Sequence, residues 1–204
     1  SITGYTVTSD PGGFTGTGTA SPIVVTGLAN GTAYTFTVMA TNTAGTSSAS
    51  AASNAVTPKA PQTITFANPG AQNFGTAPTL TASSSSTLTV TFTSNTTDVC
   101  TITPEGALTF LKAGSATIVA HQEGNALYFP AEDVSQTFTV NAVLPGAPTI
   151  GTATAGDTQA AVSFSAPAFT GGVSITVYTV TAIPGGATGT GTSSPVTVTG
   201  LTNG

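Results

Sequence analysis

The sequence predicts an all-β protein built from β-sandwiches, and three observations lead to this class. Of the 204 residues, 45 are Thr and only 4% are charged, so strong helix formers are scarce while β-branched residues abound. Short runs in which apolar and polar residues alternate recur along the chain. Gly, Pro, Asn and Ser separate these runs at intervals of about 8 to 12 residues, which is typical of sandwiches.

The charge inventory excludes several classes of function. The chain has a formal net charge of −5 and two Lys but no Arg, so it lacks the clustered cations that bind nucleic acid. No apolar run reaches the ~20 residues that span a bilayer, so no membrane segment is expected. With 39% hydrophobic residues and little charge, the composition favours a packed core over disorder.

An internal repeat dominates the sequence. Residues 1–31 and residues 174–204 align without gaps at an offset of 173, and 23 of the 31 positions are identical. The first copy continues into residues 32–58, whereas the second stops at Gly204. We therefore expect a window on a longer tandem array in which each terminus cuts through a domain.

The alternating runs place the strands in three blocks. The runs of the first block include residues 33–40, which put Tyr34, Phe36 and Val38 on one face, and residues 41–50 have turn chemistry. The other strands expected in this block are residues 5–8, 23–26 and 51–57. In the second block they are residues 63–66, 88–93, 107–111, 115–120 and 136–140, and in the third block residues 149–154, 160–165 and 175–182. Proline-containing segments at residues 57–61 and 142–148 separate the blocks and are expected to be semi-rigid spacers.

The outer blocks resemble fibronectin type III domains. The run Leu28 to Tyr34, with Gly31 between them, resembles the family's turn before a "tyrosine corner". The resemblance implies that residues 1–58 are the C-terminal part of such a domain and residues 145–204 the N-terminal part. Phe164 stands where the family usually has a core Trp. Both terminal sandwiches are therefore expected to be incomplete and to expose apolar faces unless neighbouring copies cover them.

The middle block, residues 62–141, resembles a bacterial Ig-like repeat of large cell-surface, adhesin-type proteins. The matching residues are QTITF at 62–66, VCTI at 99–102, ALTFLKAGSATI at 107–118 and QEGNALY at 122–128. Many members of that family carry a second Cys where this chain has Ala116, so Cys100 is expected to be a lone, inert, buried residue. Together the two resemblances imply a fold class of tandem Ig-like and fibronectin type III β-sandwiches, with the two terminal ones incomplete.

The residue inventory offers no catalytic, cofactor-binding or metal site, and no cofactor is expected. The only His, His121, is expected to be exposed on a strand face, far short of the three or four ligands of a zinc site. Glu132 and Asp133 are the best nucleus for calcium, but a solvated loop is favoured. Lys112 is the sole candidate inside a domain for a Lys–Asn crosslink, but an ordinary solvated Lys is favoured. With no Trp and Tyr5, Tyr34, Tyr128 and Tyr178 all expected inside, no sugar-stacking platform is visible.

Two weaker motifs complete the inventory. The Gly-rich runs at residues 12–18 and 185–191 are expected to be turns, because neither is followed by a P-loop Lys or a helix. Asn30 and Asn95 stand in N-glycosylation sequons.

These observations favour a non-catalytic structural repeat of a long extracellular bacterial surface protein, a stalk or filament. Its expected partners are neighbouring repeats of the same array, with possible lateral self-association through sheet edges that have few charges. The alternatives are an adhesin module that binds a glycan or protein, or an accessory module of a secreted polysaccharide hydrolase. The sequence names no ligand.

Overall fold

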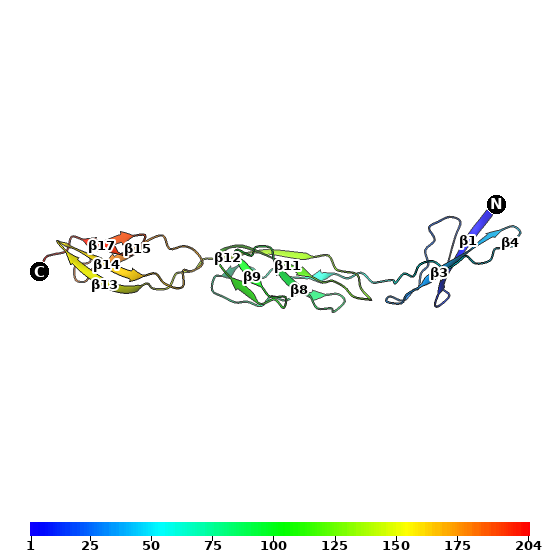
Figure 1. Ribbon diagram of the computed structural model, residues 1–204, viewed down its shortest axis with the longest axis horizontal. Helices are drawn as coiled ribbons and strands as arrows, with labels where there is room; N and C mark the ends of the chain where they lie inside the picture. Colours follow the sequence, from blue (N-terminus) through cyan, green and yellow to red (C-terminus); the bar gives the residue numbers. More distant parts are fainter. The chain divides into compact units, whose positions relative to one another are not determined.

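The computed structural model describes all 204 residues and contains strands, turns and irregular segments but no helix, so the all-β prediction is confirmed (Figure 1). The chain divides into two compact units, which are described separately. Unit 1 comprises Ser1–Thr65, Ser83–Val90 and His121–Asp133, and unit 2 comprises Phe66–Ala82, Thr91–Ala120 and Val134–Gly204. Each unit takes in part of the middle block, and the domain limits 1–58, 62–141 and 145–204 stay a prediction.

Unit 1 begins with a four-stranded antiparallel sheet in the order β2-β1-β3-β4. Its strands are β1 (Ile2–Asp10), β2 (Thr15–Gly18), β3 (Thr35–Asn42) and β4 (Gly45–Thr46). Val7 lies opposite Val38 in the register, so their side chains share one face of the sheet. The buried Tyr34, 3% exposed, accepts a hydrogen bond on its hydroxyl from the backbone N–H of Ala29 at 3.0 Å. This bond is the expected tyrosine corner.

Residues 47–56 run antiparallel along the outer edge of β3 and are held there by serine side chains, an arrangement that the sequence did not predict. Three serines spaced three residues apart each pair with one residue of β3, and the three β3 residues are spaced two apart. Each serine N–H donates to a β3 carbonyl at 2.8–3.0 Å, and its Oγ accepts from the N–H of that same residue at 3.0–3.1 Å. The pairs of this serine ladder are Ser47 with Ala40, Ser50 with Val38, and Ser53 with Phe36. Every three residues of the serine segment therefore span two residues of β3. The serine hydroxyls accept the hydrogen bonds that backbone carbonyls would accept in a regular strand.

The rest of unit 1 surrounds a buried polar network. The strands β5 (Ile64–Thr65) and β7 (Ser83–Ser84) pair with each other. The side-chain amide of Gln62 donates to Oε1 of Gln122 at 2.5 Å and to the carbonyl of Phe129 at 2.7 Å. The Ser86 hydroxyl donates to Oε1 of Gln62 and lies 3.0 Å from the Ser84 hydroxyl. The buried side chains of Gln62, Ser84 and Ser86 are thus all hydrogen-bonded, as a stable interior requires.

The first part of unit 2 holds most of the fully buried side chains. One sheet has the order β6-β12-β11-β8, and a second sheet pairs β9 with β10. The bounds are β6 (Gln72–Asn73), β8 (Thr91–Ser94), β9 (Cys100–Ile102), β10 (Leu108–Phe110), β11 (Gly114–His121) and β12 (Val134–Asn141). Leu108, Ile118 and Val140 are at most 2% exposed, and the rings of Phe110 and Phe138 meet edge to face at 6.4 Å. These residues form a close-packed core between the sheets.

The second part of unit 2 consists of two facing sheets, β13-β14-β17 and β15-β16. The strands are β13 (Thr149–Gly156), β14 (Gln159–Ser165), β15 (Tyr178–Thr181), β16 (Thr188–Gly191) and β17 (Val196–Thr199). Across the two sheets, the ring centroid of Phe164 lies 4.5 Å from that of Tyr178. This face-to-face packing is that of a β-sandwich.

Several predicted strands are wrong or too long. Residues 23–26 form no strand, and residues 51–57 make only the single bridge between Val56 and Tyr34. The predicted strands at residues 175–182 and 88–93 become β15 and β8, which begin at Tyr178 and Thr91. In each case apolar and polar residues alternate as in a strand, but either no neighbouring strand is present to pair with the segment or the neighbouring strand pairs with only part of it.

Candidate functional site

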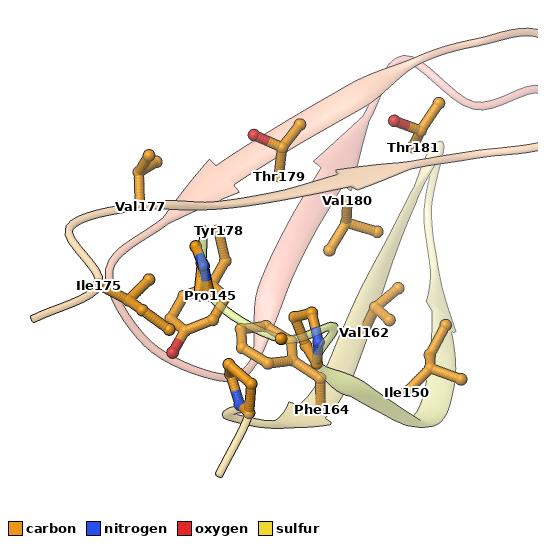
Figure 2. Close-up of a pocket in the computed structure, with 13 residues that line it drawn as sticks. Pro145, Ile150, Val162, Phe164, Ile175, Val177, Tyr178, Thr179, Val180 and Thr181 are labelled. Carbon is orange, nitrogen blue, oxygen red and sulfur yellow. The ribbon is translucent and has the colours of Figure 1, made fainter. Parts of the chain in front are cut away.

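An apolar groove with a volume of about 430 Å³ lies between the two facing sheets of unit 2 (Figure 2). Its lining is dominated by aliphatic, aromatic and proline side chains, among them Ile150, Val162, Phe164, Ile175, Tyr178 and Val180. No charged residue lines it. The groove therefore suits an apolar, uncharged occupant.

Side chains of β15 alternate between the groove and solvent. Val180 and Tyr178 point inward toward Val162 and Phe164, whereas Thr179 points away (Figure 2). Val162 on the floor is only 7% exposed. At the rim, the groove-lining residues Val177 and Ile150 are 55% and 75% exposed. The groove thus has a buried floor and an open rim.

The groove lies beside a free strand edge. β15 pairs with β16 on one side, with Tyr178 opposite Gly191, and has no strand on the other side. The backbone groups on that free edge are available to hydrogen-bond an added strand. An apolar hollow and an unpaired edge therefore meet at one place.

Unit 1 carries a second apolar hollow on the exposed face of its sheet. Tyr5, Val7, Ile23 and Val38 line it together with residues 19–21. Val38, which the alternation pattern places on one face with the buried Tyr34, is 38% exposed. The apolar faces expected in the first and third blocks are thus open to solvent. The expectation that all four tyrosines lie inside is wrong: Tyr34 is buried, but Tyr5, Tyr128 and Tyr178 are half-buried.

Two pairs of titratable side chains lie within hydrogen-bond distance of each other. Lys112 Nζ lies 2.7 Å from Asp98 Oδ2 with both side chains more than half exposed. The hydrogen bond from Lys112 and its positive charge lower the pKa of Asp98. His121, which was expected to be exposed, is half-buried, and its Nδ1 lies 2.8 Å from Asp133 Oδ1. No three His, Cys, Asp or Glu side chains come together anywhere in the chain.

The remaining candidates have plain structural surroundings. Cys100 is fully buried and free, with its Sγ 3.4 Å from the Ser94 hydroxyl. Gly12 and Gly13 adopt left-handed φ angles of 87° and 62° in the turn between β1 and β2. Residues 15–18 of this Gly-rich run are strand β2, and residues 188–191 of the second run are strand β16, so the prediction that both runs are turns is wrong for the second half of each. Asn30 and Asn95 are exposed.

Comparison with known proteins gives only distant likenesses. No protein-family model matches the chain, and no curated protein matches it. Among solved structures, the chain is similar to the FN1-FN3 domains of chicken CNTN1, with 12% identity, a TM-score of 0.27, and coverage of 98% of this chain and 79% of that one. Domains A168-A170 of titin match at 15% identity and a TM-score of 0.27, with coverage of 97% and 72%. Domains 4-9 of the surface layer protein SbsC match at 16% identity and a TM-score of 0.32, with coverage of 98% of this chain but only 35% of that chain.

Such low TM-scores carry no argument about function, so the fold class rests on the strands themselves. Facing sheets in unit 2 and the Tyr34 corner in unit 1 are features of fibronectin type III-like and Ig-like sandwiches. The chain is an all-β protein with this sandwich architecture. None of its segments is a helix with the length and hydropathy that crossing a membrane requires.

Proposed function

We propose that this chain is a non-catalytic structural repeat of a long extracellular bacterial surface protein, which forms a stalk or filament. The observation that carries the proposal is the repeated hairpin. Hairpins β1-β2 and β15-β16 share both their strand sequences and their register, at an offset of 173 residues. Repetition of one sandwich module supplies length without any chemistry.

Hydrogen bonds at the proline-containing segments support a role in which stiffness matters. In unit 1, the N–H of Gly31 donates to the carbonyl of Pro58, and Ala60 exchanges hydrogen bonds with Leu127 and Phe129. These bonds measure 2.8–2.9 Å. Backbone held in this way is less free to bend than a solvated linker.

The second proline-containing segment is held in unit 2 by a loop of the third block. Val143 N–H donates to the Gly171 carbonyl at 3.0 Å, and Gly146 N–H donates to the Phe169 carbonyl at 2.9 Å. The ring of Phe169 also lies 5.6 Å from that of Phe74. A segment fixed by backbone bonds and a ring contact resists bending, as a load-carrying stalk requires.

The surface composition also suits lateral contact between copies. Thr, Ser and Ala side chains dominate the polar faces, and the chain has two Lys and seven acidic residues in all. Neutral hydroxyl-rich faces approach one another without strong electrostatic repulsion. Sheet edges with few charges are either covered by neighbours or used in assembly.

A module that binds a protein segment is the second candidate, and the apolar groove of unit 2 favours it. The groove combines an uncharged apolar lining with the free edge of β15, which suits a peptide strand better than a sugar. An adhesin role through glycans has weaker support: Phe14, Phe129 and Phe169 are 36%, 52% and 40% exposed, but the chain has no Trp.

Surface labelling tests the proposed function. An antibody raised against the chain is expected to label intact cells of the source organism, and brief protease treatment of intact cells is expected to remove the signal. Labelling only after permeabilisation would refute the extracellular role. Sequencing the parent gene separates the alternatives, since many copies favour a stalk, whereas one or two copies beside a catalytic domain favour an accessory module.

A further inference from the structure

The strand β3 has an edge that would attract other strands if it were left open. β1 occupies one edge of β3, and β4 pairs with the other edge only at Thr41 and Asn42. The rest of β3 reads TFTVMA, a run of β-branched and apolar residues without charge or Pro. Segments of this composition pair readily with other chains when their edge is free. Proteins often block such an edge with Lys, but residues 11–58 contain no charged side chain.

The serine ladder closes this edge on the side that faces β3. Phe36, Val38 and Ala40 direct their backbone N–H and C=O groups toward the ladder, and each residue is hydrogen-bonded through both groups to one serine at 2.8–3.1 Å. The ladder ends in an ordinary bridge, in which the N–H of Tyr34 donates to the backbone carbonyl of Val56 at 2.8 Å. β3 therefore keeps no free backbone group on this edge for a strand of another chain.

The outer side of the ladder differs from the edge of a strand. Besides accepting from β3, each ladder hydroxyl donates to the carbonyl of the residue that follows its serine. The three carbonyls are those of Ser48, Ala51 and Asn54, at 2.7–2.9 Å. The N–H groups of these residues make no backbone hydrogen bond, and residues 47–57 are all exposed. The outer side therefore meets water, with three of its carbonyls already hydrogen-bonded inside the segment.

The spacing of the ladder adds a second obstacle to a new strand. Two residues of β3 extend about 6.7 Å, and three ladder residues cover this length, so the ladder rises by only about 2.2 Å per residue, whereas a strand rises by about 3.3 Å. A regular strand laid along the ladder matches its backbone groups at one point and loses the match at the next residues. A regular strand in place of the ladder would satisfy β3 equally well, but it would present a new, regular edge to other chains.

We propose that the serine ladder is an edge cap, which satisfies the hydrogen bonds of β3 and at the same time prevents strands of other copies from extending the sheet. The extra residue in each step of the ladder blocks strand addition, because it removes the strand spacing from the outer side. Chains that lie side by side at high concentration then keep separate sheets. This inference goes beyond the proposed function and does not depend on it, since it concerns the chain in any setting.

A triple deletion in the full chain tests the edge cap by removing the extra residue from each step. Loss of Ala49, Ala52 and Ala55 leaves seven residues opposite residues 34–40, with the three serines at every second position. This variant is expected to pair with β3 as an ordinary strand and to offer a regular outer edge. In sedimentation at about 0.1 mM, its weight-average mass is expected to be at least about twice that of the native chain.

Two matched variants separate edge pairing from general disruption. The substitutions Ala49→Ser, Ala52→Ser and Ala55→Ser alter the same positions but keep the spacing, so this control is expected to have the mass of the native chain. The second variant adds Ala51→Lys to the triple deletion. Ala51 then lies opposite Thr37, on the face of the sheet away from the apolar hollow. A charge at a strand edge opposes pairing, so this variant is expected to return to the native mass.

Hydrogen exchange measured by NMR tests the edge cap on the native chain. The amide of Val38 is expected to be protected, whereas the amides of Ser48, Ala51 and Asn54 are expected to exchange freely at about 0.1 mM and at about 1 mM alike. Protection of these three outer amides that grows by about fivefold or more with concentration, which is the effect of one hydrogen bond, would overturn the proposal.

Three outcomes with the variants would overturn it as well. The first is a deletion variant that stays monomeric while its Val38 amide is protected. The second is a serine-substituted control that associates as strongly as the deletion variant, and the third is a Lys-containing variant that associates undiminished. The exchange measurement needs no variant, so it decides the matter even if the deletion disrupts β3.

Discussion

Replacing Ser50 by alanine is the most direct test of the serine ladder. The Oγ of Ser50 accepts a hydrogen bond from the N–H of Val38 at 3.1 Å, and its own N–H donates to the carbonyl of Val38 at 3.0 Å. Ser50→Ala removes the first of these bonds and keeps the second. The N–H of Val38 is then left without its acceptor on the outer edge of β3.

The expected size of the effect follows from one hydrogen bond. A typical intramolecular hydrogen bond contributes about 0.5–1.5 kcal/mol net, and each 1.4 kcal/mol is a factor of ten in an equilibrium constant. The bond lies at an exposed position, so the lower half of this range applies. Hydrogen exchange measured by NMR is expected to show that protection of the Val38 amide falls by about 2- to 5-fold.

Two control variants separate the hydrogen bond from general loosening. The Ser48 hydroxyl makes no hydrogen bond, so Ser48→Ala is expected to leave the exchange of Val38 unchanged. Ser50→Thr keeps a hydroxyl and is expected to retain most of the protection. The reasoning is wrong if Ser50→Ala leaves the Val38 amide fully protected, or if Ser48→Ala lowers its protection equally.

Three further predictions concern single side chains. Tyr34→Phe removes the acceptor of the Ala29 N–H and is expected to lower the free energy of unfolding by about 1 kcal/mol in denaturant titrations; an unchanged midpoint and slope would contradict this. Lys112→Met is expected to raise the pKa of Asp98 toward 3.8 in an NMR titration. In the native protein the Lys112–Asp98 pair stabilises the fold above the lowered pKa of Asp98, and this stabilisation is lost as the pH falls through that pKa. The variant is expected to lack this pH-dependent loss. Cys100 is expected to resist iodoacetamide in the folded protein and to react once it unfolds, so rapid native labelling would disprove its burial.

The regular strands were predictable because alternation and burial agree there. The patterns at residues 115–120 and 136–140 predicted β11 and β12, whose inward residues Ile118 and Val140 are fully buried. The tyrosine corner was also predictable, since Leu28 and Gly31 precede Tyr34 at the spacing that it requires.

Other parts could not be predicted because they depend on partners rather than on local sequence. Residues 23–26 read IVVT and residues 196–199 read VTVT, yet only the second segment is a strand, because only it lies beside β14. Strand propensity measures the fit to neighbours, and it carries no information on whether a neighbour is present.

The serine ladder and the groove escaped prediction for related reasons. Ser47, Ser50 and Ser53 act as backbone substitutes, so their segment has no apolar alternation and resembles a turn in sequence. The groove is lined by residues such as Val180 and Phe164, whose pattern predicts an interior position. Sequence predicted that apolar faces would be open in the outer blocks, but not that the hollow would meet a free edge at β15.

The near-identity of the two terminal hairpins has a consequence for the nascent chain. A strand such as β3 cannot distinguish the YTVT of β1 from the YTVT of β15 by sequence, and tandem proteins with closely similar neighbours are prone to mispairing during synthesis. Here residues 62–141, whose sequence is unrelated to either hairpin, separate the two copies. By the time the ribosome delivers the second hairpin, β3 has long been able to close on the first, so the dissimilar middle block acts as a delay that protects the fidelity of folding.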